Sequence, residues 1–153
     1  MQLAYPTDFV GDEMNDARLL DIELFRHFAD EHVRFCDTDA LGHVNVGVYS
    51  SYFAAGRAIF DTMLASDDYI LPIARIAMDL RAEIKYPNKI VVGSLLLQTG
   101  RSSFLVGQGL WIEGEPMATA EVTHVLVDRK SGRSAPLPEP FLHKLKTLGP
   151  GAG

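Results

Sequence analysis

One long segment of low charge, from Asn45 to Leu64, constrains the fold of this chain more than any other feature. Its twenty residues include only two charged side chains, Arg57 and Asp61. Apolar or small residues recur there at the spacing of one helix face, namely at Tyr49, Tyr52, Phe53, Gly56, Ile59, Phe60 and Met63. A surface helix would show a full polar face. We therefore expect a long helix that begins after an Asn45 N-cap and is buried on most of its circumference.

The residues that follow predict a structure able to wrap such a helix. The stretch from Leu80 to Tyr86 alternates apolar and charged residues in the period-two pattern of a strand. Three further strands are expected at Ile90 to Thr99, Phe104 to Glu113 and Met117 to Asp128. The turns between these three are short, so consecutive strands must be antiparallel. The pattern predicts an α+β fold in which one long helix packs on the face of an antiparallel sheet.

The ends of the chain have weaker patterns. We expect a short helix around Asp16 to Phe28, a short strand from His32 to Cys36 and a last helical turn or two from Phe141 to Leu148. There is no internal repeat. We expect one domain over residues 29–142, with a partly ordered N-terminal extension over residues 1–28 and a tail over residues 143–153.

Charge and cysteine content exclude several classes of protein. The chain has 14 Lys and Arg residues against 20 Asp and Glu residues, and its net charge of −6 argues against a dedicated nucleic-acid binder. Its single cysteine, Cys36, can form no intrachain disulfide, which indicates a reducing, cytoplasmic location. The N-terminal residues lack the basic region of a targeting peptide. The longest uncharged run, Ala40 to Gly56, is too short and too polar for membrane insertion.

The densest group of polar residues stands directly before the long helix, in the segment Asp37 to Asn45. A helix N-terminus presents unpaired N–H groups and a partial positive charge, which suit an oxyanion. A carboxylate just upstream would then act on the carbon bearing that oxygen, as a nucleophile or as a general base toward water. The alternative is that these residues only build a turn and a helix cap, which is the usual role of their types.

Other polar groups favour structural roles. Two histidines and two aspartates between residues 32 and 43 have ligand chemistry, but the chain shows no helical histidine pair and no second cluster, so we expect no metal site. Cys36 is expected to be an inert small residue rather than a nucleophile. His124 shares its strand face with apolar residues, which favours a hydrogen-bonded core histidine.

The segment Val33 to Asn45, which contains the run D-x-D-x-x-G-H-V-N, closely resembles the acyl-CoA thioesterases of the 4-hydroxybenzoyl-CoA thioesterase type, in the hot-dog fold superfamily. The resemblance continues at Tyr49, Tyr52, Phe53, Arg57, Gly100 to Phe104, Ala118, Ala120, Val127, Asp128, Gly132 and Arg133. It covers about residues 30 to 142. It implies a hot-dog fold, in which a curved antiparallel sheet of about five strands wraps a long central helix.

The resemblance also implies roles for individual residues. Asp39 matches the second aspartate of the motif and would be the catalytic carboxylate. The backbone N–H of Val46 would polarise the thioester carbonyl, and Gly42 would let the chain turn close to the substrate. The site would be shaped by three further residues, His43, Asn45 and Tyr49. The implied activity is hydrolysis of an acyl-CoA to a free acid and CoA, without a metal or an organic cofactor.

Coenzyme A carries phosphates, so an acidic protein that binds it should place cations at the mouth of its pocket. Arg101 is the leading candidate, with Ser102 and Ser103 beside it in a predicted hairpin. Arg81 and Lys85 are candidates ranked behind it, because the alternation around them points both side chains outward, as expected of surface residues. Family members are dimers or tetramers with active sites at the subunit interface, so the resemblance also implies a homodimer or homotetramer.

One position departs from the family pattern. Many relatives carry a second asparagine where this chain has Val46. A backbone N–H survives that change, whereas a side-chain role does not. Together with the N-terminal extension, this motivates an alternative, a non-catalytic acyl-CoA-binding or regulatory hot-dog protein. An aromatic and a fatty acyl group are both compatible with the aromatic residues of the helix.

Overall fold

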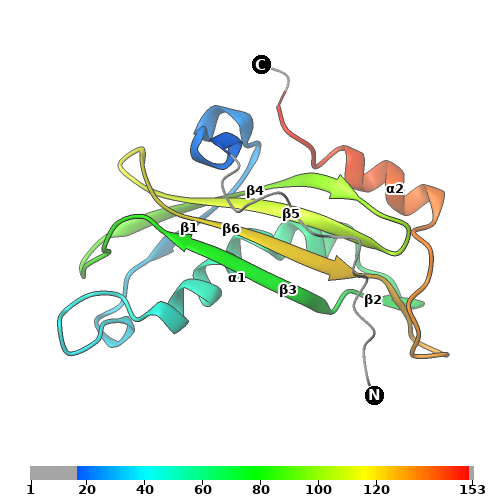
Figure 1. Ribbon diagram of the computed structural model, residues 1–153, viewed down its shortest axis with the longest axis horizontal. Coiled ribbons are helices and arrows are strands. Elements are labelled where there is room, and N and C mark those ends of the chain that lie inside the picture. Colours follow the sequence, from blue (N-terminus) through cyan, green and yellow to red (C-terminus); the bar gives the residue numbers. More distant parts are fainter. Residues whose placement is uncertain (1–16, 152–153) are drawn as a thin grey trace.

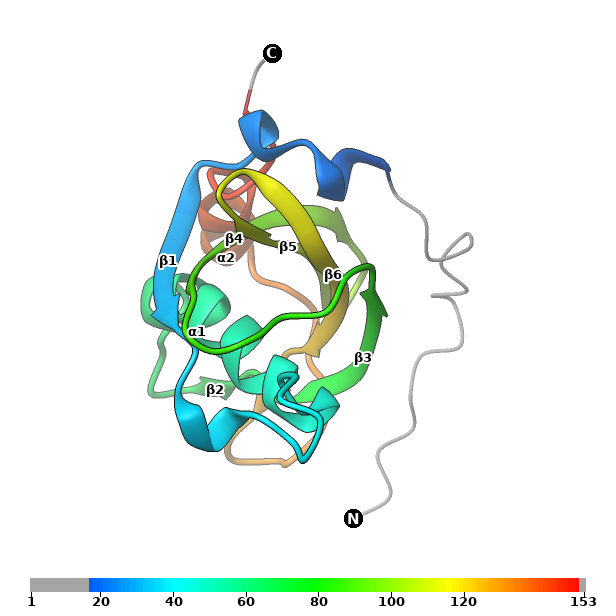
Figure 2. The same cartoon turned by 90° about the vertical axis from the view of Figure 1, so that its left-hand side faces the viewer.

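The segment of low charge forms one long helix, α1 (Val46–Met63), in a computed structural model that describes residues 17–151. A five-stranded sheet curves around α1 in the order β1-β4-β5-β6-β3, and every neighbouring pair is antiparallel (Figures 1 and 2). The strands are β1 (His27–His32), β3 (Ile73–Leu80), β4 (Lys89–Thr99), β5 (Ser103–Ile112) and β6 (Glu115–Val125). The predicted α+β fold, with a long helix wrapped by an antiparallel sheet, is confirmed.

Smaller elements complete the described chain. They are the 3₁₀ turns η1 (Ala17–Leu20), η2 (Ile22–Leu24) and η3 (Phe35–Asp37), the two-residue strands β2 (Tyr69–Ile70) and β7 (Val127–Asp128), and the helix α2 (Glu139–Lys146). Helix α2 lies where a last helical turn or two was predicted, and Leu145 and Leu148 from this end of the chain are fully buried. Between residues 17 and 151 no helix has both the length and the hydropathy required to cross a membrane.

Two predictions for the N-terminal third are wrong. The expected helix around Asp16 to Phe28 is instead two 3₁₀ turns followed by the start of β1 at His27; Asp16 itself lies outside the described residues. The expected strand from His32 to Cys36 is shifted, because the strand ends at His32 and residues 35–37 form η3. The cause is the Asp37 carboxylate, which accepts a hydrogen bond from the Arg34 amide at 2.8 Å and turns the chain there.

The predicted strand from Leu80 to Tyr86 is also wrong. Strand β3 ends at Leu80, and residues 81–88 cross from β3 to β4 as a loop. Of the four apolar residues in the alternating pattern only Ile84 is buried, whereas Leu80 and Tyr86 are about half exposed, so the segment is an extended loop that buries one side chain. Strand β3 itself was missed because Ile73 and Ile76 are about two-fifths exposed on a sheet edge and give no clear periodicity.

The core lies between α1 and the inner face of the sheet. Phe53 and Phe60 of α1 have no exposed surface. The helix approaches the sheet closely at Gly56, where a Cβ atom would collide with Val92. Figure 2 shows the sheet curving round one side of this helix. The expected burial on most of its circumference is wrong for the single chain, because the opposite side of α1 is exposed at Ser51, Ala54 and Ala58. The low charge of the segment comes from small and hydroxyl residues on that side.

Part of the outer face of the sheet is covered by residues 17–25 (Figure 1). Leu19 of η1 and Phe25 are buried against Trp111 in a cluster separate from the main core. Both side chains pack over glycines of the sheet. A Cβ atom added at Gly93 would lie 2.7 Å from the Phe25 ring, and one added at Gly107 would collide with the Leu19 side chain. Residues 17–25 therefore pack on this face through contacts that depend on the two glycines.

Candidate active site

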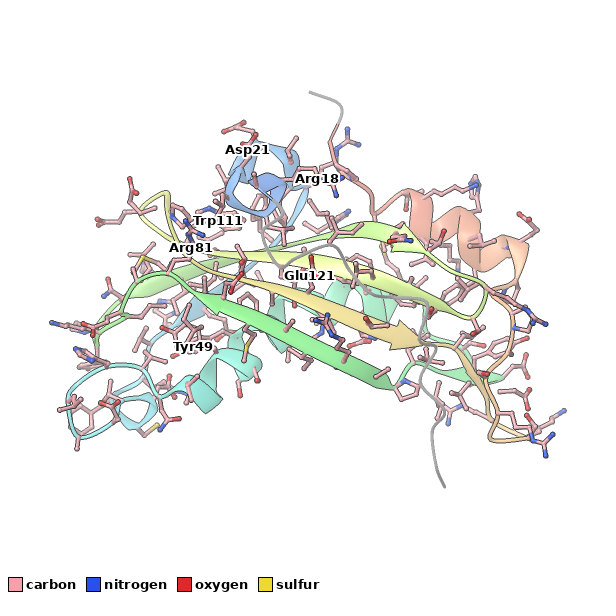
Figure 3. All side chains as sticks on the ribbon, viewed as in Figure 1. Arg18, Asp21, Tyr49, Arg81, Trp111 and Glu121 are labelled. Carbon is pink, nitrogen blue, oxygen red and sulfur yellow. The ribbon has the colours of Figure 1, made fainter. Side chains whose placement is uncertain are left out.

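A pocket of about 430 Å³ opens at the N-terminal end of α1. Its walls come from the segment before the helix, from the first turn of the helix, and from the loop that follows β3. The lining residues are Asp39, His43, Val44, Asn45, Val46, Tyr49, Leu80, Arg81, Ala82, Glu83 and Ile84. Figure 3 labels Tyr49 and Arg81, which come from different walls. The site predicted from one contiguous motif is thus closed by a second segment.

The segment of residues 37–45, here called the Asp39 loop, is closed by its own backbone. The Asp39 amide donates to the His43 carbonyl at 2.8 Å, and the Gly42 amide donates to the Asp39 carbonyl at 3.0 Å. The Asp39 carboxylate accepts hydrogen bonds from the amides of Leu41 and His43, at 2.8 and 3.2 Å. Gly42 has a φ of 79°, a left-handed conformation that favours glycine. The loop therefore presents an exposed carboxylate at the pocket.

The first aspartate of the motif, Asp37, has a different environment. Its side chain is 3% exposed, and it accepts hydrogen bonds from the Arg34 side chain and from the Tyr52 hydroxyl. Burial alone would raise the pKa of Asp37, but the hydrogen bonds from Arg34 and Tyr52 outweigh it and hold this pKa below its ordinary value. Asp37 is therefore an ionised structural group.

The N-terminus of α1 keeps a free donor in the pocket that Asp39 lines. The Asn45 side chain accepts from the Gly47 amide at 2.9 Å, and the Asn45 carbonyl accepts from the Val48 amide at 2.9 Å. The amide of Val46, the first helical residue, has no acceptor among residues 17–151. Because it lies at the positive end of the helix, it suits a developing oxyanion.

His43 and Glu83 join the two walls of the pocket. His43 Nε2 lies 3.1 Å from Glu83 Oε2, and the Val44 amide donates to the Ile84 carbonyl at 2.8 Å. Burial, and to a lesser extent the charge of Glu83, raises the pKa of the neighbouring Tyr49. Tyr49 therefore stays protonated and contributes a neutral side chain to the wall of the pocket.

Residues 33–145 match the family model of the thioesterase-like superfamily. The chain belongs to this superfamily. The match confirms the family resemblance drawn from the motif and the hot-dog fold that it implied. No curated protein sequence matches the chain.

Solved structures agree with this membership. A thioesterase from Thermus thermophilus, complexed with coenzyme A and Zn, is 30% identical, with a TM-score of 0.75 over 83% of this chain and 96% of that one. The PA5185 protein from Pseudomonas aeruginosa is 27% identical, with a TM-score of 0.72 over 86% of this chain and 96% of that one. A DHNA-CoA thioesterase from Staphylococcus aureus, 18% identical, shares the fold with a TM-score of 0.68 over 78% of this chain and 87% of that one.

The structure gathers most of the residues that the thioesterase resemblance singled out. Asp39, His43, Asn45, Val46 and Tyr49 line one pocket, and Gly42 turns the loop that carries them. These residues are close in sequence, so a local motif was sufficient to find them.

Three predicted residues lie elsewhere in the chain. Arg101, Ser102 and Ser103 occupy the hairpin between β4 and β5, at the end of the sheet opposite the Asp39 loop. Arg101 is exposed, whereas Ser103 is 2% exposed on β5. Within one chain of this thioesterase-like protein they do not reach the pocket.

Sequence reasoning missed the second wall. Arg81 was ranked behind Arg101 as a cation of the pocket and was expected at the surface, yet it lines the pocket with Glu83. The alternation around Ile84 correctly predicted that the Arg81 side chain is exposed. It could not predict that this side chain faces the Asp39 loop. No local pattern could have shown which segment faces the Asp39 loop, because the contact depends on the path of residues 81–88.

The two remaining candidates, His124 and Cys36, have different environments, because one is buried and the other is exposed. His124 is 2% exposed, stacks on Phe104 at 5.0 Å and places Nδ1 3.4 Å from the Leu71 carbonyl; burial lowers its pKa. Cys36 is an exposed free thiol. Over residues 17–151 no three His, Cys, Asp or Glu side chains gather in a group that could hold a metal ion.

Proposed function

We propose that the protein is an acyl-CoA thioesterase that hydrolyses an acyl-CoA to a free carboxylic acid and CoA. The observation that carries the proposal is that the Asp39 carboxylate and the N-terminus of α1 line one open pocket. Membership in the thioesterase-like superfamily supports thioester hydrolysis. The Thermus thermophilus thioesterase that was complexed with coenzyme A supports CoA as the thiol.

In this proposal the Val46 amide holds the thioester oxygen as negative charge develops on it. Asp39 then acts in one of two ways. As a nucleophile it attacks the carbonyl carbon, the C–S bond breaks with loss of CoA thiolate, and water later hydrolyses the mixed anhydride. As a general base it takes a proton from water, whose oxygen attacks the same carbon as the C–S bond breaks. Both routes consume one water and restore Asp39.

Trapping a labelled acyl group on Asp39 distinguishes the routes, because only the nucleophilic route forms an acyl-enzyme. The proposed reaction needs no metal and no organic cofactor, since a carboxylate and a helix N-terminus supply both required functions. The unpaired thiol of Cys36 fits the cytoplasm as its proposed location.

We also propose that the chain acts as a homodimer joined through β3. This strand pairs only with β6, so its other edge is unpaired within the described sheet. It exposes Ile73, Ile76 and Leu80 by about two-fifths each. A long apolar edge of this kind readily pairs with another strand.

The charges of β3 fit a second copy in one register. Arg75 and Asp79 stand two residues on either side of Ala77. An antiparallel pair centred on Ala77 therefore places each arginine opposite the aspartate of the other copy, a favourable cross-strand pair.

This register also brings the two ends of the sheet together. Ile73 pairs with His124 and lies at the same end as the Arg101 hairpin, whereas Leu80 lies at the Asp39 end. In the dimer, the end of one copy that carries Arg101 meets the Asp39 pocket of the other. Arg101 therefore remains our proposed phosphate-binding cation, with Ser102 and Ser103 beside it.

The test is thiol release from short, long and aromatic acyl-CoAs by the wild-type chain, by Asp39→Asn and by a matched control, Asp30→Asn. Asp30 is an exposed aspartate on β1. We expect Asp39→Asn to lose hydrolysis of every substrate while it keeps its fold, and Asp30→Asn to match the wild type. Binding of acyl-CoA without release by the wild type would instead favour the regulatory alternative, which is motivated by Val46 in place of a second asparagine and by the N-terminal extension.

A further inference from the structure

The two aspartates of the D-x-D run lie two residues apart and have opposite surroundings. Asp37 is 3% exposed, while Asp39 is exposed. Both oxygens of Asp37 are occupied: Oδ1 by Arg34 Nε at 3.1 Å, and Oδ2 by the Arg34 amide at 2.8 Å and the Tyr52 hydroxyl at 2.7 Å. Asp37 therefore cannot reach a substrate in the pocket.

Asp37 instead connects three parts of the site. Its side chain binds Arg34, which stands before the Asp39 loop, and Tyr52, which stands in the second turn of α1. Its backbone carbonyl accepts from the Asn45 amide at 2.9 Å, and Asn45 is the N-cap of the helix. One residue thus ties the entry of the loop, the exit of the loop and the helix together.

The Asp39 carboxylate has no such anchor. Within the described chain, its hydrogen bonds come from Leu41 and His43, which belong to the same loop. The distance between this carboxylate and the Val46 amide therefore depends on how the loop is held. The loop contacts the second wall through His43 and the Val44 amide, and its two ends need contacts of their own. Asp37 holds both ends.

We infer that Asp37 is a positioning residue, which acts through the Asp39 loop and uses the Tyr52 hydroxyl as its link to α1. The role depends on the carboxylate being an anion, because Arg34 and Tyr52 are both donors to it. Burial, reinforced by the adjacent carboxylate, raises the pKa of Tyr52, so its hydroxyl keeps the proton that it donates. The inference rests on the proposed function for its catalytic consequence, but its structural consequence is independent.

The decisive variant is Tyr52→Phe, which removes one hydroxyl and leaves the ring in the core. Asp37→Asn is a second variant that keeps the size of the side chain. The matched control is Tyr69→Phe, the same chemical change on β2, beyond the other end of α1. For each variant we would measure amide hydrogen exchange at Leu41, His43 and Asn45, the melting temperature, and kcat and KM for the best acyl-CoA of the panel.

We expect Tyr52→Phe to speed exchange at these three amides by about ten-fold or more, the effect of losing a hydrogen bond to a charged group. We expect kcat to fall by a similar factor while KM changes less than about two-fold, because a displaced Asp39 affects the reaction more than binding. Tyr69→Phe should change none of these quantities.

The inference is overturned if Tyr52→Phe lowers the melting temperature but leaves loop exchange and kcat at wild-type values, since Asp37 would then have only a stabilising role. If the wild-type chain hydrolyses no acyl-CoA, the proposed function fails, and the exchange measurement alone decides whether Asp37 positions the loop.

Discussion

The guanidinium of Arg57 donates a hydrogen bond to Oε1 of Gln108 at 3.0 Å, between α1 and the inner face of the sheet. The Gln108 side-chain amide in turn donates to the Phe53 carbonyl and to the Ser94 hydroxyl, each at 2.8 Å. Both Arg57 and Gln108 are nearly inaccessible to solvent. Burial lowers the pKa of Arg57, and the charge of Asp61 opposes that shift. One glutamine of β5 thus satisfies polar groups from the helix and from β4.

We predict that Gln108→Leu destabilises the fold more than Arg57→Met does. Gln108→Leu removes the acceptor of a buried cation, and we expect a loss of roughly 3 kcal/mol. Arg57→Met removes the charge together with its need for an acceptor, and we expect a loss of about 1 kcal/mol. Urea unfolding of the two variants measures the difference. Equal losses would show that Arg57 takes a solvent-accessible position in solution.

The pH dependence of stability should reveal Asp37. Its pKa is below the ordinary value of 3.8, so its contribution to stability is complete above that value and is lost as the pH falls through the lower pKa of the folded state. We therefore expect Asp37→Asn to be less stable than the wild type by a constant amount from about pH 5 to 8. The difference should shrink below about pH 4. Unfolding free energies measured from pH 2 to 8 check this, and a difference that persists at pH 2 would contradict it.

The charge register of β3 predicts which edge of the sheet associates. Asp79→Arg places two arginines opposite each other in the proposed dimer, and we expect it to weaken dimerisation by about ten-fold or more. Asp30→Arg makes the same change on β1, the other edge strand, and should leave dimerisation unchanged. Sedimentation equilibrium over a range of concentrations measures both constants. The reverse pattern would assign the interface to β1.

Arg101 and Asp39 should act in trans. Arg101→Ala is expected to raise KM for acyl-CoA by about ten-fold with a smaller change in kcat, because it removes a contact with a phosphate. Asp39→Asn should be inactive. When the two variants are mixed and allowed to exchange subunits, each mixed dimer contains one intact site, so roughly a quarter of all sites should regain the wild-type KM.

If subunit exchange is demonstrated and no low-KM fraction appears in the mixture, Arg101 does not belong to the active site. Arg81 would then be the stronger candidate, because it lines the pocket within the same chain.

Sequence patterns predicted those elements whose signals are local. Helix α1 was clear because a long segment of low charge follows an N-cap residue. Strands β4, β5 and β6 were clear because long apolar runs end at turns rich in glycine and proline. The Asp39 side of the pocket belongs to the same category, since its residues lie within one short motif.

The missed features depend on contacts between distant residues. Strand β3 lies at the sheet edge, where its apolar side chains stay partly exposed, so neither a buried run nor a clean alternation marked it. The pairing of Tyr52 with Asp37 joins residues fifteen positions apart and needs the turn at η3 to be known first. Arg81 reaches the pocket only because the chain crosses from β3 to β4 over the end of the helix.

The cover on the outer face has a consequence for related sequences. Leu19 and Phe25 fit there because residues 93 and 107 have no side chains. A homologue that lacks residues before β1 would leave these two glycines facing water beside an exposed indole at position 111. We expect such shorter homologues to carry bulkier residues at positions 93 and 107, so that the length of the N-terminus and the size of these two residues change together during evolution.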